Sequence, residues 1–102
     1  MTRDEALAKL RALRPQLEAL GFRHVWLFGS VARDEAGPES DVDLLVEVDE
    51  GRIENPWHRA TFAHEAQADV AALLGEQADV IDRDVIHDRF VRRVAGELVD
   101  VF

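Results

Sequence analysis

The chain has 102 residues, of which 47% are hydrophobic and 32% charged, a composition that predicts one soluble globular domain over residues 1–102. Its 12 basic and 21 acidic residues give a net charge of −9. This charge argues against binding of long RNA or DNA, but it is compatible with binding of a nucleotide that is complexed with a divalent cation. The lack of cysteine excludes disulfides and thiolate metal sites, and no apolar run is long enough to span a membrane. We therefore expect a cytoplasmic protein.

The first predicted element is a helix that starts near Thr2 and runs to Gly21. Leucines recur along it at steps of three and four residues, which is the spacing of one helical face. Thr2 and Glu5 have the spacing of a capping box at the start of the helix. Pro15 is expected to kink or split the helix, and Gly21 to end it.

Two strands are predicted next. Residues 24–28 form a short apolar run that is typical of a buried strand, and residues 31–33 can form one helical turn. Residues 34–40 contain a glycine and a proline and are expected to form a loop. Residues 41–48 then alternate with a period of two, which predicts a second strand with two different faces.

The second half of the chain alternates helix and strand. A long helix is predicted from Asn55, its expected cap, to Gly75. Residues 78–81 are expected to form a third short strand, and Asp84 to cap a last helix whose apolar side extends to Val101. This order of elements predicts an α/β (α+β) fold, in which helices pack on a small sheet of at least three strands.

Asp41 and Asp43 are the first candidate functional residues. They are two residues apart on a predicted strand, so both side chains leave the same face. Carboxylates held this close repel by roughly 4 kcal/mol at an effective dielectric constant of about 20. One of them must take up a proton, or a cation such as Mg²⁺ must lie between them. The alternative is that alternating aspartates form only a solvated strand face.

Gly29 and Ser30 are candidates for binding a phosphate. Glycine lets the backbone come close to a ligand. A helix that starts after Ser30 presents free N–H groups and a partial positive charge to a phosphate, and the serine hydroxyl can add a donor. The alternative is a plain turn or helix cap.

A third carboxylate would complete a two-metal site, and two candidates lie on or next to the last predicted strand. Asp79 and Asp82 are three residues apart, so they face opposite sides and only one can join Asp41 and Asp43. We favour Asp79, which leads an apolar pair, whereas Asp82 stands where the chain turns into the last helix. Asp79 could also be only a strand-end residue.

These motifs match a known family. Gly29-Ser30, ten intervening residues and then Asp41-Val42-Asp43 resemble the signature of the DNA polymerase beta nucleotidyltransferase superfamily. Together, residues 27–33 and 40–46 resemble the minimal nucleotidyltransferases (MNT) of bacteria and archaea. The central motif is specific, and the resemblance extends over nearly the whole chain.

The resemblance continues at residues 75–81, where such proteins have a glycine and then a valine-aspartate strand and this chain has Ala78-Asp79. One departure is Asp34, because the family commonly has glycine after the arginine of the motif. We expect it to affect the loop more than the chemistry.

The resemblance implies a polymerase beta-like nucleotidyltransferase fold, that is, a small mixed β-sheet with helices packed on it. It implies ATP as the substrate and a two-metal Mg²⁺ site. The third carboxylate would bind the second metal or deprotonate the acceptor. The arginine of the motif is counted among the nucleotide-binding residues, with a surface pair to Glu35 as the alternative. The implied catalytic and metal-binding residues are Asp41, Asp43 and Asp79, and the implied nucleotide-binding residues are Gly29, Ser30 and Arg33.

Proteins of this kind and size often act as antitoxins, which pair with a helical HEPN-domain RNase toxin and attach AMP to one of its tyrosines. The resemblance therefore implies AMP transfer from ATP to a hydroxyl group of a HEPN-domain toxin protein. We expect the last helix with its apolar end, residues 98–102, to dock that partner, unless it only covers the sheet. A non-catalytic antitoxin that acts by binding and occlusion stays open, as does a nucleotidyltransferase for a small molecule or an RNA end. Formation of a homo-oligomer stays open too.

Overall fold

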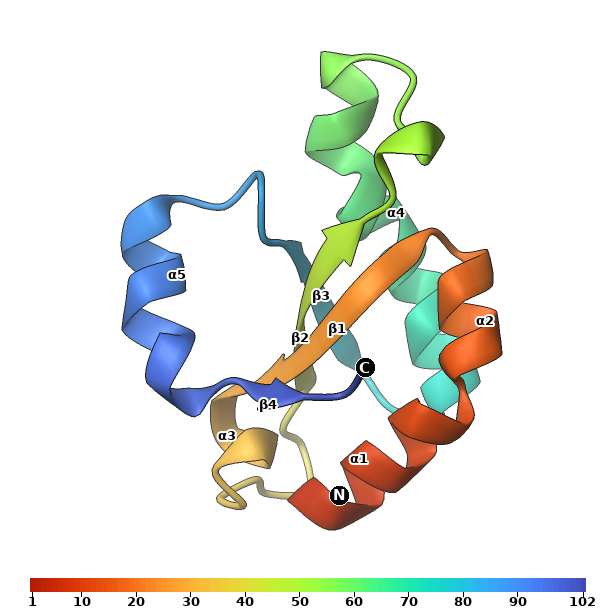
Figure 1. Ribbon diagram of the computed structural model, residues 1–102. Coiled ribbons are helices and arrows are strands. Elements are labelled where there is room, and N and C mark those ends of the chain that lie inside the picture. The colour runs from red at the N-terminus through yellow and green to blue at the C-terminus, as the bar shows by residue number, and fades with distance from the viewer.

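A mixed sheet of four strands runs through the centre of the molecule (Figure 1). The computed structural model describes all residues from Met1 to Phe102. Its strands, in the spatial order β3-β2-β1-β4, are β1 (Phe22–Phe28), β2 (Val42–Val48), β3 (Ala78–Asp82) and β4 (Val99–Asp100). β1 is antiparallel to β2 and β4, whereas β2 and β3 are parallel. The predicted mixed sheet with helices packed on it is confirmed.

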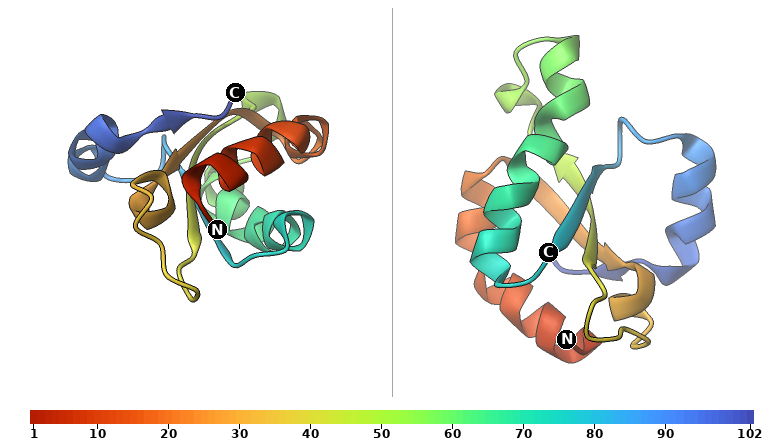
Figure 2. Two further views of the ribbon diagram at one scale, coloured as in Figure 1. Left: turned by 90° about the horizontal axis from the view of Figure 1, so that it is seen from below. Right: turned by 180° about the vertical axis from the view of Figure 1, so that it is seen from behind.

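Three helices cover one face of the sheet (Figure 2): α1 (Arg3–Ala12), α2 (Arg14–Ala19) and α4 (Pro56–Leu74). Thr2 caps α1 as predicted, its Oγ1 accepting the N–H of Glu5 at 3.1 Å. The predicted split falls between α1 and α2, with Pro15 in the first turn of α2. Asn55 caps α4, and Gly75 ends it with a φ of +75°. Local sequence signals therefore define these three helices well.

The two faces of β2 differ. One face points into the main hydrophobic core beneath α1, α2 and α4, and its side chains are at most 1% exposed: Val42, Leu44, Val46 and Val48. On the other face, Leu45 is buried with Phe28 and Val94 in a smaller cluster under α5 (Asp88–Val94). Asp43 lies on this second face and is half-buried. The predicted alternation is confirmed for the strand, and it leaves Asp43 outside the main core.

The last helix is shorter than predicted. His87 caps α5 by accepting the N–H of Arg89 on Nδ1 at 3.1 Å. The prediction of Asp84 as the cap is therefore wrong. The helix ends at Val94 and is followed by a 3-10 turn, η2 (Ala95–Glu97), and then by β4.

The apolar C-terminal residues complete the sheet instead of extending the helix. Val99 pairs with Leu27 of β1, and Val101, 5% exposed, belongs to the main core. Gly96 disfavours a continued helix, and the β-branched valines favour a strand. The prediction that the last helix continues through residues 98–102 is therefore wrong, whereas the docking of a partner at this apolar segment stays a prediction.

Two short elements complete the fold. α3 (Gly29–Ala32) follows β1 directly, and η1 (Glu50–Arg52) precedes α4. β1 and β2 are antiparallel, so the end of β1 lies beside the start of β2. α3 follows β1 directly and therefore lies at this end of the sheet. None of the helices is both long enough and apolar enough to cross a membrane.

Candidate functional site

Three of the predicted site residues meet at one end of the sheet. Asp43 of β2 is opposite Phe28 in the antiparallel pair with β1, and opposite Asp79 in the parallel pair with β3. Gly29 follows Phe28 and starts α3. Because opposite residues on neighbouring strands share a face, Asp43 and Asp79 lie side by side. Asp41 precedes β2 by one residue and is exposed.

Only glycine fits at position 29. Its φ of +76° lies in the left-handed region, and a Cβ there would collide with the carboxylate of Asp43. Glycine therefore lets Asp43 lie directly against the start of α3. No side chain caps this short helix, so the N–H groups of its first turn are available to a ligand. Ser30 is half-buried in the same turn and adds a hydroxyl group.

The charge at this end of the sheet is not compensated by the protein. None of Asp41, Asp43 and Asp79 forms an ion pair. Burial raises the pKa of Asp43 from 3.8 to about 6, together with the nearby charges of Asp79 and Asp41, while Arg33 acts in the opposite direction. A cation would therefore be favourable here near neutral pH.

The three aspartates are neighbours without forming an assembled metal centre. No group of three or more His, Cys, Asp or Glu side chains in the structure is arranged so that it could hold a metal ion. Carboxylate oxygens are nevertheless the ligands that Mg²⁺ prefers, and Asp43 has a pKa raised by burial and by its acidic neighbours and forms no ion pair. The residues fit a hard cation by charge and ligand type, and the two-metal arrangement stays a prediction.

Arg33 is held by two acidic side chains at the edge of this site. Its guanidinium lies 2.6 Å from Oε2 of Glu97 and 3.1 Å from Oε2 of Glu35, and these hydrogen bonds, that to Glu97 first, raise the pKa of Arg33. The ion pair with Glu35, which was the alternative to nucleotide binding, is therefore present. Glu97 belongs to η2, 64 residues further along the chain, and no local sequence signal identifies it.

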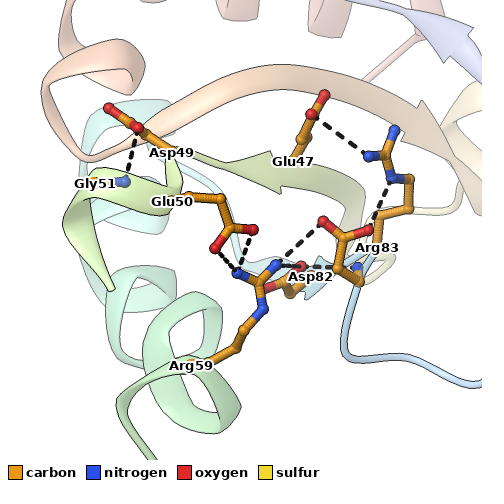
Figure 3. A network of polar contacts seen from close by, with 8 residues as sticks. Glu47, Asp49, Glu50, Gly51, Arg59, Asp82 and Arg83 are labelled. Carbon is orange, nitrogen blue, oxygen red and sulfur yellow. Dashed lines mark hydrogen bonds and ion pairs between the residues drawn. The ribbon is translucent and has the colours of Figure 1, made fainter. Parts of the chain in front are cut away.

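Asp82 lies on the opposite face of β3 from Asp79. It is 5% exposed, and its Oδ1 lies 3.8 Å from the guanidinium of Arg59 on α4. Arg59 also contacts Glu50 at 2.6 Å and Asp84 at 3.1 Å, so that one arginine links three acidic residues (Figure 3). The structure thus places Asp79, and not Asp82, beside Asp43. A catalytic role for Asp79 stays a prediction.

Residues 10–101 match the family model of the nucleotidyltransferase domain. The chain belongs to this nucleotidyltransferase family. The match covers the motif of α3 and β2 as well as β3, and it confirms the resemblance found in the sequence.

Two relatives are similar over most of their length. A protein of Methanocaldococcus jannaschii, provisionally named a protein adenylyltransferase, is 33% identical over 91 residues, which are 89% of this chain and 91% of the relative. Protein adenylyltransferase MntA of Thermococcus cleftensis is 30% identical over 102 residues, which are 99% of this chain and 97% of the relative.

Solved structures show the same fold. One that is provisionally described as a minimal nucleotidyltransferase matches with a TM-score of 0.73 and 30% identity, over 97% of this chain and 95% of the other. A chain from the complex of a tri-AMPylated Shewanella oneidensis HEPN toxin with its MNT antitoxin matches with a TM-score of 0.64 and 14% identity, over 93% of this chain and 70% of the other. The predicted minimal nucleotidyltransferase fold is confirmed.

Proposed function

We propose that this chain is a Mg²⁺-dependent protein adenylyltransferase that acts as an antitoxin, transferring AMP from ATP to a tyrosine hydroxyl of a HEPN-domain toxin. The proposal depends above all on Asp43, which lies between Gly29 and Asp79, has a pKa raised to about 6 and has no cation of the protein paired with it. The names of the two relatives support transfer of AMP to a protein. The solved complex of the same fold supports a HEPN-domain partner.

The reaction joins the acceptor oxygen to the α-phosphorus of ATP. The bond from that phosphorus to the oxygen that bridges to the β-phosphorus breaks, and pyrophosphate leaves with that oxygen. The proton of the acceptor hydroxyl passes to a carboxylate of the site, for which we propose Asp79 because it stands on the strand next to Asp43.

The phosphates would be bound where α3 begins. The free N–H groups of its first turn, with Gly29 and the hydroxyl of Ser30, would donate to the phosphate oxygens. Arg33 would add a positive charge once it separates from its acidic partners. Mg²⁺ would be held by Asp41, Asp43 and Asp79, and its positive charge would stabilise the negative charge on the oxygens of the α-phosphate during transfer.

The acceptor has to be positioned by a partner. The structure has a single pocket, and none of the three aspartates lines it. Correct orientation of the acceptor is a large part of the catalytic effect in group transfer. We propose that a partner protein orients the acceptor beside the three aspartates.

The test is to incubate the chain with ATP, Mg²⁺ and the protein encoded next to it, which the proposal expects to carry a HEPN domain, and to measure intact masses. We expect AMP on a tyrosine of the partner, and no added mass with Asp41→Ala or with a chelator. If Asp41→Ala silences the partner equally well with no added mass, occlusion replaces transfer as the mechanism. If AMP appears on an added RNA or small-molecule acceptor and not on the partner, the acceptor is not a protein.

A further inference from the structure

The single pocket of the structure lies on α5, outside the chemistry proposed above. Its volume is about 430 Å³, a size typical of small-molecule sites. It is lined by His87, Arg89, Phe90 and Arg93. Two of the four side chains are fixed cations, although the chain as a whole carries a net charge of −9. This local reversal of charge favours an anionic ligand.

The two pocket arginines have no acidic partner. Neither Arg89 nor Arg93 forms an ion pair, whereas Arg92, which lies between them in the sequence and does not line the pocket, is 4.0 Å from Asp88. His87 uses Nδ1 to cap α5, which leaves its other ring nitrogen for a ligand. Guanidinium groups bind phosphate through paired, charge-assisted hydrogen bonds.

Phe90 gives the pocket an aromatic wall and links it to the candidate site. The guanidinium of Arg93 is 5.4 Å from the centre of the Phe90 ring. The same ring packs edge-on against Phe28, with centroids 5.7 Å apart and an interplanar angle of 81°. Phe28 precedes Gly29 and is opposite Asp43. One aromatic pair therefore separates the pocket from the carboxylates.

We propose that this pocket is a second nucleotide site, which binds a nucleoside monophosphate group with its phosphate on Arg89 and Arg93 and its base against Phe90. A bare phosphate would use the arginines alone, whereas a nucleotide also uses the aromatic wall. The role of the pocket in the reaction, though not the binding itself, rests on the proposed function. An enzyme that attaches AMP to a protein forms a product that carries a nucleoside monophosphate group. The pocket can bind that attached AMP while the next ATP binds at the carboxylates.

The test is calorimetry of the full chain with AMP in the presence of a chelator, so that no metal site is occupied. We expect AMP binding that weakens at least tenfold in the double variant Arg89→Ala/Arg93→Ala. The matched control Arg92→Ala removes an arginine of the same helix outside the pocket and should change affinity less than twofold. Ser30→Ala and Asp43→Asn, at the triphosphate site, should not weaken AMP binding either.

Four outcomes would overturn the proposal. AMP that does not bind, or that binds the double variant as well as the original chain, shows that the pocket is no nucleotide site. Loss of AMP binding in Ser30→Ala places AMP at the start of α3. Inorganic phosphate that binds as tightly as AMP reduces the pocket to a general anion site. Failure of the proposed function would look different, because AMP binding would persist while no AMP is transferred.

Discussion

Two groups of carboxylates flank β3, and the protein compensates their charges differently. The arginine-bound cluster consists of Glu50, Asp82 and Asp84 around Arg59, each within 4.0 Å of its guanidinium. The open cluster consists of Asp41, Asp43 and Asp79 on the other side of the sheet, with no ion pair. Both clusters contain a carboxylate removed from water, Asp82 in the first and Asp43 in the second, and burial raises the pKa of each.

The difference indicates which cluster serves the fold and which serves a ligand. In the arginine-bound cluster a guanidinium replaces part of the water that burial removes, and it ties α4 to β3. In the open cluster no carboxylate is paired with a cation, and only the charge of Arg33, which is itself paired with other acids, opposes the rise in the pKa of Asp43, so the ionised form of Asp43 remains unfavourable. Strongly perturbed pKa values of this kind concentrate at functional sites. Because burial raises the pKa of Asp82 as well, it is the missing ion pair, and not the pKa alone, that favours the open cluster as the proposed ligand site.

Single substitutions of the two β3 carboxylates should give the largest difference between the clusters, measured as the rate of AMP transfer. Asp79→Asn is expected to lower the rate of AMP transfer by about three orders of magnitude, roughly 4 kcal/mol, because it removes a metal ligand and proton acceptor. The side chain of Asp82 faces α4 and not Asp43. The rate of AMP transfer in Asp82→Asn should therefore stay within roughly threefold of that of the original chain. The rates are measured on protein shown to be folded by circular dichroism. Equal losses in the two variants would contradict the assignment.

Removing the arginine of the arginine-bound cluster should affect stability and not chemistry. Arg59→Ala leaves Asp82, 5% exposed, without a cation, and we expect a loss of about 3 kcal/mol in the free energy of unfolding. Arg83→Ala is the matched control, since Arg83 contacts Glu47 and Asp84 at 3.5 and 3.4 Å and its side chain is 35% exposed. It should cost less than about 1 kcal/mol. Urea unfolding measures both, and similar losses would show that burial does not decide the effect.

In the open cluster, removal of a charge should stabilise the protein. We expect Asp43→Asn to raise the free energy of unfolding of the metal-free protein near pH 7.5 by about 1–2 kcal/mol. The pKa of Asp43 is about 6 in the folded chain against 3.8 ordinarily, so the folded state holds the proton more tightly. Well below pH 4 both states are protonated and the carboxylate costs nothing. Between about pH 4 and 6 the unfolded state ionises first and stability is lost, and above 6 the loss is complete.

The full pKa shift corresponds to about 3 kcal/mol, and screening by solvent at this half-buried site reduces it. Urea unfolding with a chelator, near pH 4 and near pH 7.5, measures the difference between the variant and the original chain. The difference should be much smaller at the lower pH, where most of the linkage effect is still absent. A variant that is less stable near pH 7.5 would show that the carboxylate of Asp43 supports the fold.

The open cluster could largely be predicted from the sequence because its geometry is local. Gly29 and Asp43 belong to one short motif, and the period of two along a strand places Asp41 and Asp43 on one face. The same parity separates Asp79 from Asp82, and the register of β2 and β3 then brings Asp79 to Asp43. The close contact between the carboxylate of Asp43 and Gly29 could not be predicted from the sequence and is seen only in the structure.

Contacts between distant segments could not be predicted. The arginine-bound cluster unites η1, α4 and the end of β3, and the partner of Arg33 comes from η2. Apolar spacing after Ile86 suggested one long helix, but pairing of Val99 with Leu27 formed a strand there. Asp34 has a φ of +59° at the position where the motif of the family is expected to have glycine, and its carboxylate accepts the N–H of Arg3 at 3.1 Å. That bond offsets backbone strain in a way no motif reveals.

The smallest expected effect concerns Arg33, whose charge reaches the open cluster while its guanidinium is paired with acids outside it. Glu97→Gln removes the charge that holds Arg33 at 2.6 Å. The two side chains are 46% and 30% exposed, so solvent screens the pair and its loss should change stability little. The freed guanidinium can turn to the phosphates of ATP. We expect the KM for ATP to fall about two- to fivefold, equivalent to less than about 1 kcal/mol, with kcat unchanged.

Glu35→Gln is the matched control for this effect, because it removes the weaker partner of the same guanidinium, 3.1 Å away and 67% exposed. Its influence on KM should be smaller than that of Glu97→Gln. Arg33→Ala should raise KM, since the charge offered to the phosphates is then lost altogether. If neither Glu97→Gln nor Arg33→Ala changes KM, the guanidinium does not meet the nucleotide. Arg33 then belongs with Arg59 as an arginine that serves the scaffold, and the open cluster would have to bind its ligand without any cation from the chain.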